Sequence, residues 1–117
     1  MALNQRYTHF RHIALTADKA YTSGAPVRIG AIAGVAQTSA AEGEKVTVWL
    51  DGSYDLPVAG ALTEGQPVYI KADGTLTATA SGNYPWGVAV VAKGTGTAPS
   101  EVAPYGHNPA VAVAATA

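Results

Sequence analysis

The chain has 117 residues, of which 48% are apolar and 13% are charged, with a formal net charge of −1 and no cysteine. One domain accounts for this length, and the apolar share excludes disorder of the whole chain. The near-neutral charge argues against nucleic-acid binding as the main role, and the lack of cysteine excludes disulfides, thiol nucleophiles and Cys-ligated zinc.

The apolar content consists mostly of small side chains. Alanine, glycine and threonine supply 24, 13 and 12 residues, whereas phenylalanine and methionine supply one each. Because the free energy gained on burial scales with apolar area, a core of Ala and Val gains less per residue than one of Leu and Phe. We therefore expect the chain to gain stability from partners, including further copies of itself.

Neither a membrane nor a nucleic acid is an expected partner. No run of 18 or more apolar residues occurs, and the first residues, MALNQRYTHFRH, lack the apolar stretch of a signal peptide. We expect the protein to be made and kept in a cytosol-like compartment, or to be assembled into something there.

The first 19 residues predict an extended, basic and aromatic arm. Residues 1–20 contain three basic side chains and one acidic one, whereas the rest of the chain contains four basic and seven acidic side chains. A short segment of this kind packs poorly by itself, and its Arg and aromatic residues are those enriched at the centres of interfaces. The expected contact residues of the arm are Arg6, Tyr7, His9, Phe10, Arg11 and His12.

From residue 20 to residue 117 the pattern is typical of an all-β body. Turn-forming pairs such as Asp51-Gly52 and Asp73-Gly74 recur at intervals of about ten residues, the spacing of short strands in sandwiches and barrels. Short segments rich in Val, Ile, Thr and aromatic residues lie between them. The expected strands are residues 12–16, 26–30, 33–37, 45–51, 67–71, 75–80, 84–92 and 110–114.

The clearest local prediction is a hairpin of residues 67–71 and 75–80. Asp73-Gly74 predicts a two-residue turn between them, because these residues suit backbone with positive φ. In the second strand, alternation predicts three threonines outward and Leu76, Ala78 and Ala80 inward.

No segment shows the apolar spacing of a helix with a cap in front of it. Residues 93–109, rich in glycine and proline, predict a loop. The expected fold is therefore a small, single-domain, all-β sandwich or barrel.

The candidate catalytic and metal-ligating residues do not assemble into a site. His9 and His12 are three positions apart on an extended segment, so their side chains point to opposite faces, and His107 lies in a turn-rich loop. The serines lie in predicted turns, and no Gly-X-Ser-X-Gly motif occurs. We expect no enzyme activity, no cofactor and no metal.

The aromatic residues of the body have two interpretations. Aromatic residues on a sheet belong more often to a core or an interface, so we expect Trp49, Tyr84 and Trp86 to contribute to contacts with partners. The alternative is a carbohydrate- or surface-binding module that presents Trp49, Tyr54 and Trp86 as a platform.

The motifs of residues 20–92 follow one another in a specific order. The segments TSGAPVRIG and IAGVA are followed by AEGE, YDLP, EGQPVY, ADGTLT, SGN and GVA. This succession resembles the small capsid cement, or head-decoration, family of tailed bacteriophages. A recombinase-like label, which some members carry, does not fit, because the chain lacks a phosphate-binding glycine–lysine motif.

The resemblance implies a non-enzymatic structural protein on the outer surface of a virion. Such proteins commonly form trimers at three-fold positions and fasten neighbouring major capsid proteins against internal DNA pressure. It therefore implies two partners, the major capsid protein and further copies of the chain in a homotrimer, with synthesis in the bacterial host cytoplasm. It also adds the tulip-like arrangement of some head-decoration proteins to the possible barrel-like folds.

Overall fold

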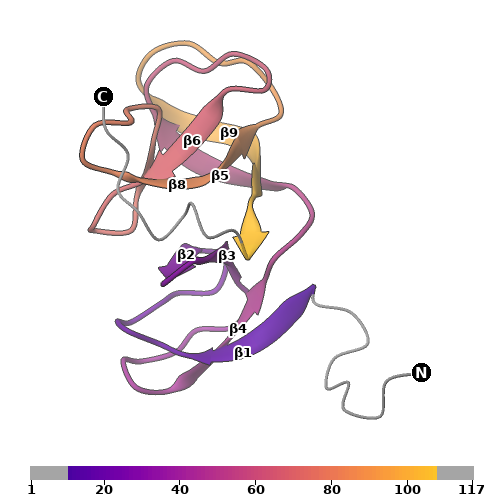
Figure 1. Cartoon of the computed structure of the whole chain (residues 1–117). Helices are drawn as coiled ribbons and strands as arrows, with labels where there is room; N and C mark the ends of the chain where they lie inside the picture. The colour runs from indigo at the N-terminus through magenta and orange to yellow at the C-terminus, as the bar shows by residue number, and fades with distance from the viewer. Residues whose placement is uncertain (1–10, 108–117) are drawn as a thin grey trace.

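The computed structural model describes residues 11–107 as an all-β protein with two stacked parts, a five-stranded sheet and a closed barrel (Figure 1). The sheet contains β1 (His12–Thr16), β2 (Pro26–Ile29), β3 (Ile32–Ala36), β4 (Lys45–Trp49) and β10 (Gly106–His107). The barrel contains β5 (Tyr54–Ala59), β6 (Pro67–Ile70), β7 (Leu76–Thr77), β8 (Tyr84–Ala89) and β9 (Thr97–Pro104). The prediction of a small all-β, barrel-like fold is confirmed.

Strand β3 is the centre of the sheet. It pairs antiparallel with β2 on one side and with β4 and β10 on the other. Strand β1 extends the sheet beyond β4, with Ile13 opposite Val48 and Leu15 opposite Val46. Because alternate residues of a strand share a face, these four aliphatic side chains lie on one face of the sheet and pack in its core.

The barrel closes in the order β5-β7-β6-β8-β9, with β9 returning to β5. In the β5–β9 ladder, Pro57 lies opposite Pro99. Since neither proline has an N–H, this pair occupies a non-hydrogen-bonded position, where the backbone nitrogens point away from the partner strand. Two prolines are therefore accommodated in the middle of a closed barrel.

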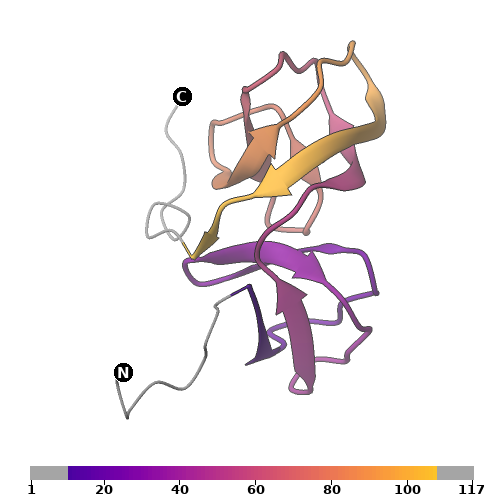
Figure 2. The same cartoon turned by 90° about the vertical axis from the view of Figure 1, so that its right-hand side faces the viewer.

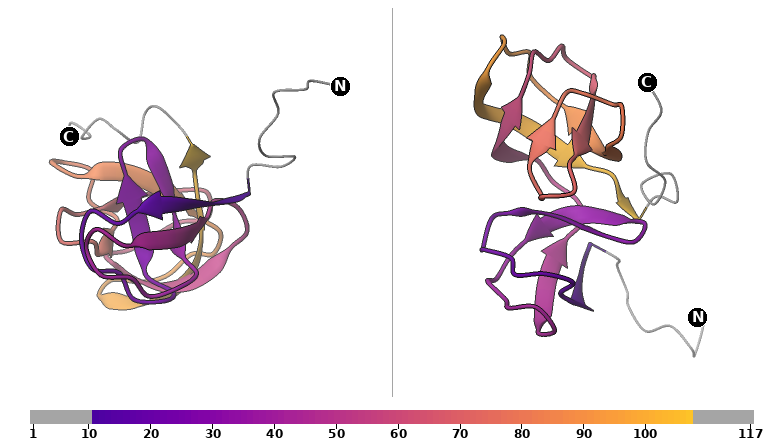
Figure 3. Two further views of the ribbon diagram at one scale, coloured as in Figure 1. Left: turned by 90° about the horizontal axis from the view of Figure 1, so that it is seen from below. Right: turned by 90° about the vertical axis from the view of Figure 1, so that its left-hand side faces the viewer.

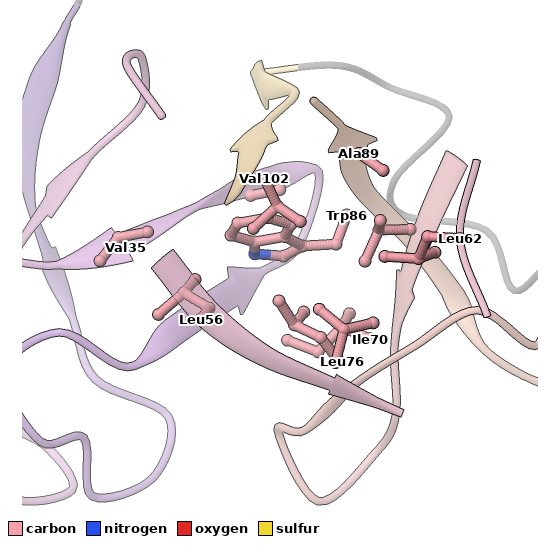
Figure 4. Close-up of a cluster of buried hydrophobic side chains, with 11 residues drawn as sticks. Val35, Leu56, Leu62, Ile70, Leu76, Trp86, Ala89 and Val102 are labelled. Carbon is pink, nitrogen blue, oxygen red and sulfur yellow. The ribbon is translucent and has the colours of Figure 1, made fainter. Parts of the chain in front are cut away.

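The two parts share strand β3 between two hydrophobic cores. Ala33 and Val35 of β3 belong to the barrel core, whereas Ala36 belongs to the core of the sheet. In Figure 4 the fully buried Trp86 occupies the side of the barrel core that faces Val35. Because one strand serves both cores, the sheet and the barrel form a single folded unit.

The chain crosses between the two parts at two places. Residues 50–53 lead from β4 into the barrel, and Tyr105 alone separates β9 from β10, which returns to the sheet (Figures 2 and 3). The backbone N–H of Tyr105 donates to the carbonyl of Trp86 at 2.9 Å. Two crossings of the chain, together with strand β3, thus connect the sheet and the barrel.

The predicted strands at 12–16, 26–30, 33–37, 45–51, 67–71 and 84–92 are confirmed, with shifts of a few residues at their ends. The predicted strand at 110–114 lies outside the described residues. Residues 12–16, which lie inside the predicted arm of residues 1–19, pair with β4 as a strand of the sheet.

The predicted hairpin is present, but its turn is longer and its second strand shorter. Lys71 accepts a hydrogen bond from the N–H of Gly74 and donates one to the carbonyl of Thr75, so the turn has the three residues 72–74. Only Gly74 has a positive φ, of 92°. Thr77, predicted to point outward, is buried between its partner strands, where it pairs with Ala59 of β5 and Tyr69 of β6, and its hydroxyl accepts a hydrogen bond from the N–H of Thr79.

The prediction of a loop over residues 93–109 is wrong. Strand β9 occupies Thr97–Pro104 and pairs with β5, which was not among the predicted strands either. Each strand contains a proline that argues against a strand when it is considered alone. Because the two prolines lie opposite each other, they do not rule out strands here. This pairing is visible only in the tertiary structure.

Candidate interaction surfaces

An aromatic pair lies at the beginning of β1, where His12 is exposed and Trp49 is half-buried. His12 and Trp49 face each other across β1 and β4, with ring centroids 4.6 Å apart and planes inclined by 43°. Beside them, Arg11 Nε lies 3.7 Å from the carboxylate of Asp51, and both side chains are more than half exposed. The structure thus brings together Arg11, His12 and Trp49, three of the expected contact residues, which we call the β1 cluster.

Trp86 is not a surface residue. Its side chain is completely buried, and its indole N–H donates to the carbonyl of Gly34 at 3.2 Å. The expectation that Trp86 makes a capsid or oligomer contact is therefore wrong, and a sugar-binding platform of Trp49, Tyr54 and Trp86 is not present. The Tyr54 ring packs against the barrel core, and its hydroxyl donates to the carbonyl of Asp51 at 2.7 Å.

Tyr84, a further expected contact residue, connects the two parts of the molecule. It is half-buried at the start of β8, and the guanidinium of Arg28 on β2 lies 3.8 Å from its ring centroid. This cation–π contact therefore joins the sheet to the barrel. Sequence reasoning did not single out Arg28, because nothing local indicates that β2 lies next to β8.

Four of the expected contact residues, Arg6, Tyr7, His9 and Phe10, lie outside the described residues. Among the described residues, the exposed large apolar side chains are Val90, Val91 and Tyr105. None of these three was among the expected contact residues. Val90 and Val91 lie in a run of small apolar residues, and nothing in that pattern predicts that they are exposed.

A cleft of about 250 Å³ opens between β2 and the barrel. Its lining is mostly apolar and consists of Pro26, Pro57, Ala59, Lys71, Gly74, Thr75, Leu76 and Thr97. The ammonium group of Lys19, in the segment between β1 and β2, donates to the carbonyl of Ala72 in the adjoining turn at 3.0 Å. Among the described residues, Lys71 is the one ionisable side chain that lines the cleft, so they provide no acid–base pair there.

The shifted pKa values of four titratable groups are explained by burial or by hydrogen bonds within the fold. Burial, followed by the hydrogen bond to Asp18, raises the pKa of Tyr21. Burial also raises the pKa of Tyr54 and of Tyr105. Hydrogen bonds from the hydroxyl and the N–H of Thr75 lower the pKa of Asp73 in the β6–β7 turn.

Two further observations concern residues 11–107. Within this range no group of three His, Cys, Asp or Glu side chains is placed to hold a metal ion. None of the described residues forms a helix with the length and apolar character needed to cross a bilayer. A surface cluster of an exposed arginine and two aromatic residues on an all-β body is typical of a small protein that binds other macromolecules.

Comparison with known families identifies this chain. The family model for phage cement proteins matches residues 7–104, which include all of the sheet except β10 and the whole barrel. The chain therefore belongs to the phage cement protein family, and the resemblance found in the order of its motifs is confirmed. The family gives it a structural role in a bacteriophage capsid. Neither the curated proteins nor the solved structures contain a significant match.

Proposed function

We propose that this cement protein binds the outer surface of the phage head as a homotrimer and fastens neighbouring major capsid proteins, without an enzymatic step. The observation that carries the proposal is the match of residues 7–104 to the cement protein family. Under this proposal the chain is made in the host cytoplasm and then assembles on the head.

The links between sheet and barrel support a mechanical role. The shared strand β3, the Trp86–Gly34 hydrogen bond and the Arg28–Tyr84 contact all join the two parts. Within residues 11–107, every buried side-chain nitrogen and oxygen has a hydrogen-bond partner. A closely packed body of this kind has low compressibility and transmits strain between its contacts.

The shell contact that we propose combines residues 1–10 with the β1 cluster. Arg11 is available for such a contact, because its ion pair with Asp51 is exposed and an exposed pair contributes little to stability. His12 and Trp49 add aromatic surface next to it. In a trimer, three such modest contacts act at high effective concentration, so their combined affinity far exceeds that of one.

Decoration of capsids that lack this protein tests the proposal. We expect the purified chain to sediment with such capsids and to raise the temperature at which they release DNA. Higher salt should weaken the initial capture, because exposed charges are screened beyond about 10 Å at 0.1 M ionic strength. If the full chain does not sediment with capsids, the proposed function is wrong.

A truncation tests the role of the arm separately. Deletion of residues 1–10 keeps His12 and the rest of β1 in place, so the far-UV circular dichroism should not change. The truncated chain should no longer sediment with capsids. Normal decoration by this variant would show that residues 1–10 are not part of the contact. Light scattering after size-exclusion chromatography measures whether the full chain is a trimer.

A further inference from the structure

Strand β1 has an open outer edge among the described residues. Within residues 11–107, its only partner strand is β4. Arg11, directly before β1, accepts a hydrogen bond from the N–H of Leu50, and Ala17, directly after β1, donates one to the carbonyl of Glu44. The backbone groups of the odd-numbered residues therefore point toward β4, because the direction alternates along an antiparallel strand.

The alternation turns the even-numbered residues of β1 outward. The backbone N–H and C=O groups of His12, Ala14 and Thr16 point to the open side, and all three residues are exposed. The register with β4 is regular over the whole strand, so no bulge twists this edge away. β1 thus presents a straight row of backbone donors and acceptors.

The strand at the opposite edge of the sheet is protected. β2 begins with Pro26, which has no N–H, and carries the charged Arg28, which lies over the Tyr84 ring. Proline and charged residues are the means by which proteins prevent pairing at a sheet edge. The sequence of β1, HIALT, contains neither. An edge without them is a template for another strand.

We propose that β1 pairs with β1 of a second copy, antiparallel about a two-fold axis at Ala14. In this register Ala14 lies opposite its own counterpart, and His12 lies opposite Thr16 of the partner subunit. These are the residues whose backbone groups point outward, so each opposed pair exchanges two hydrogen bonds.

The strand is complementary to itself on both faces. On one face, neither Asp, Glu, Lys nor Arg occurs, so no like charges meet across the axis. On the other face, Ile13 meets Leu15 of the partner subunit. Leu15 is only half-buried in one copy and already packs against the sheet core, so pairing would extend this core across the axis.

A contact about a two-fold axis cannot close a three-fold ring. In a trimeric protein the β1 pairing therefore joins one trimer to the next, and on a capsid it would link cement proteins to one another as well as to the shell. Only the placement of this pairing on the capsid shell rests on the proposed function. The pairing itself is a property of the free protein.

Sedimentation velocity of the full chain over a range of concentrations tests the pairing. We expect the mass of the wild type to rise reversibly above that of its basic oligomer as the concentration rises. Ala14→Pro removes the central N–H of the edge without removing a hydrogen bond to β4, and proline is tolerated on edge strands. Loss of two central hydrogen bonds should weaken association about tenfold. Far-UV circular dichroism verifies that the variant folds.

Charge variants at the axis provide a second test. Ala14→Lys and Ala14→Glu each place like charges opposite each other and should weaken association about two- to fivefold. A mixture of the two variants should associate again, because opposite charges then face each other. The same pair of substitutions at Ala61, an exposed residue of the barrel, is the matched control and should not change association.

The outcomes separate this pairing from the proposed function. Equal masses for the wild type and every Ala14 variant would overturn the pairing. Loss of capsid binding in the Ala14 variants without a change in their association would assign the edge to a strand of the capsid protein, and would also overturn it. A wild type that associates through Ala14 but does not bind capsids would contradict the proposed function and support the pairing.

Discussion

The indole N–H of Trp86 donates to the carbonyl of Gly34 at 3.2 Å, which links the centre of the barrel core to the central strand of the sheet. Both groups are buried, and an unpaired buried polar group costs about 1–3 kcal/mol. Gly34 also lies tightly against β4, since an added Cβ would collide with the backbone oxygen of Trp49. One residue pair therefore joins the two cores at a point where β3 leaves no room for a larger residue.

Trp86→Phe should lower the free energy of unfolding by about 1–3 kcal/mol, because the Gly34 carbonyl loses its donor, with a further loss from the reduced volume. Urea titration followed by far-UV circular dichroism measures the change. Trp49→Phe is the control, because Trp49 is half-buried and should lose less than about 1 kcal/mol. Equal losses in the two variants would contradict the role assigned to Trp86.

Gly34→Ala and Gly87→Ala should destabilise the protein by about 3 kcal/mol or more, at or beyond the upper end of overpacking costs. In both, the added Cβ meets backbone: the Trp49 oxygen beside Gly34 and the Ala103 oxygen beside Gly87. Gly94→Ala is the matched control, since no atom lies within 4 Å of its added Cβ and its φ is not positive.

We expect Gly94→Ala to be neutral or to stabilise the protein by up to about 1 kcal/mol, because alanine reduces the freedom of the unfolded chain. Thermal unfolding of the three variants measures their relative stabilities. A folded Gly34→Ala protein with wild-type stability would show that β3 and β4 can move apart without cost.

Arg28→Ala should cost about 0.5–1 kcal/mol through loss of the cation–π contact with Tyr84. Arg11→Ala is the matched control, because it removes an arginine whose ion pair with Asp51 is exposed on both sides, and it should cost less. Chemical denaturation of the two variants under the same conditions gives the comparison. A larger loss in Arg11→Ala would contradict the link between β2 and β8.

Because of Tyr21, we expect the stability of the folded protein to be sensitive to alkaline pH. Burial and the hydrogen bond from its hydroxyl to Asp18, at 2.5 Å, raise the pKa of Tyr21 in the folded state. A group with a raised pKa contributes its full stabilisation below its unfolded pKa of about 10, and this contribution is lost as the pH rises above that value. The folded protein should therefore lose stability faster than Tyr21→Phe above pH 10.

Urea midpoints of the wild type and of Tyr21→Phe between pH 7 and pH 11 measure this difference. At pH 7 the variant should be less stable by about 1 kcal/mol, because it lacks the hydrogen bond to Asp18. The gap should narrow above pH 10. Parallel curves over the whole range would show that ionisation of Tyr21 does not contribute.

The paired prolines show why part of the fold could not be predicted. Pro57 and Pro99 each lie in a segment without a clear strand pattern, and the segment around Pro99 predicted a loop. Opposite each other in the β5–β9 ladder, neither proline interrupts a hydrogen bond. The pairing partner of a segment decides whether its proline is tolerated, and that partner is more than 40 residues away in the chain.

The candidate interaction surface could likewise be predicted only in part from the sequence. Composition alone singled out the arginine and aromatic residues, and three of them, Arg11, His12 and Trp49, meet at the start of β1. The same criterion also selected Trp86, which is completely buried. An aromatic residue on a strand satisfies the sequence pattern of a core and that of an interface equally well, so burial had to come from the folded structure.

From the sequence by itself came the all-β class, most strand positions, the absence of cysteine chemistry and the order of motifs that leads to the cement protein family. These properties depend on neighbours along the chain, because strand alternation and turn chemistry are local. Only the tertiary structure decided the division into sheet and barrel, the burial of Trp86 and the open edge of β1. Each of these depends on contacts between segments distant in the sequence, and which segments meet is determined by the packing of the whole chain.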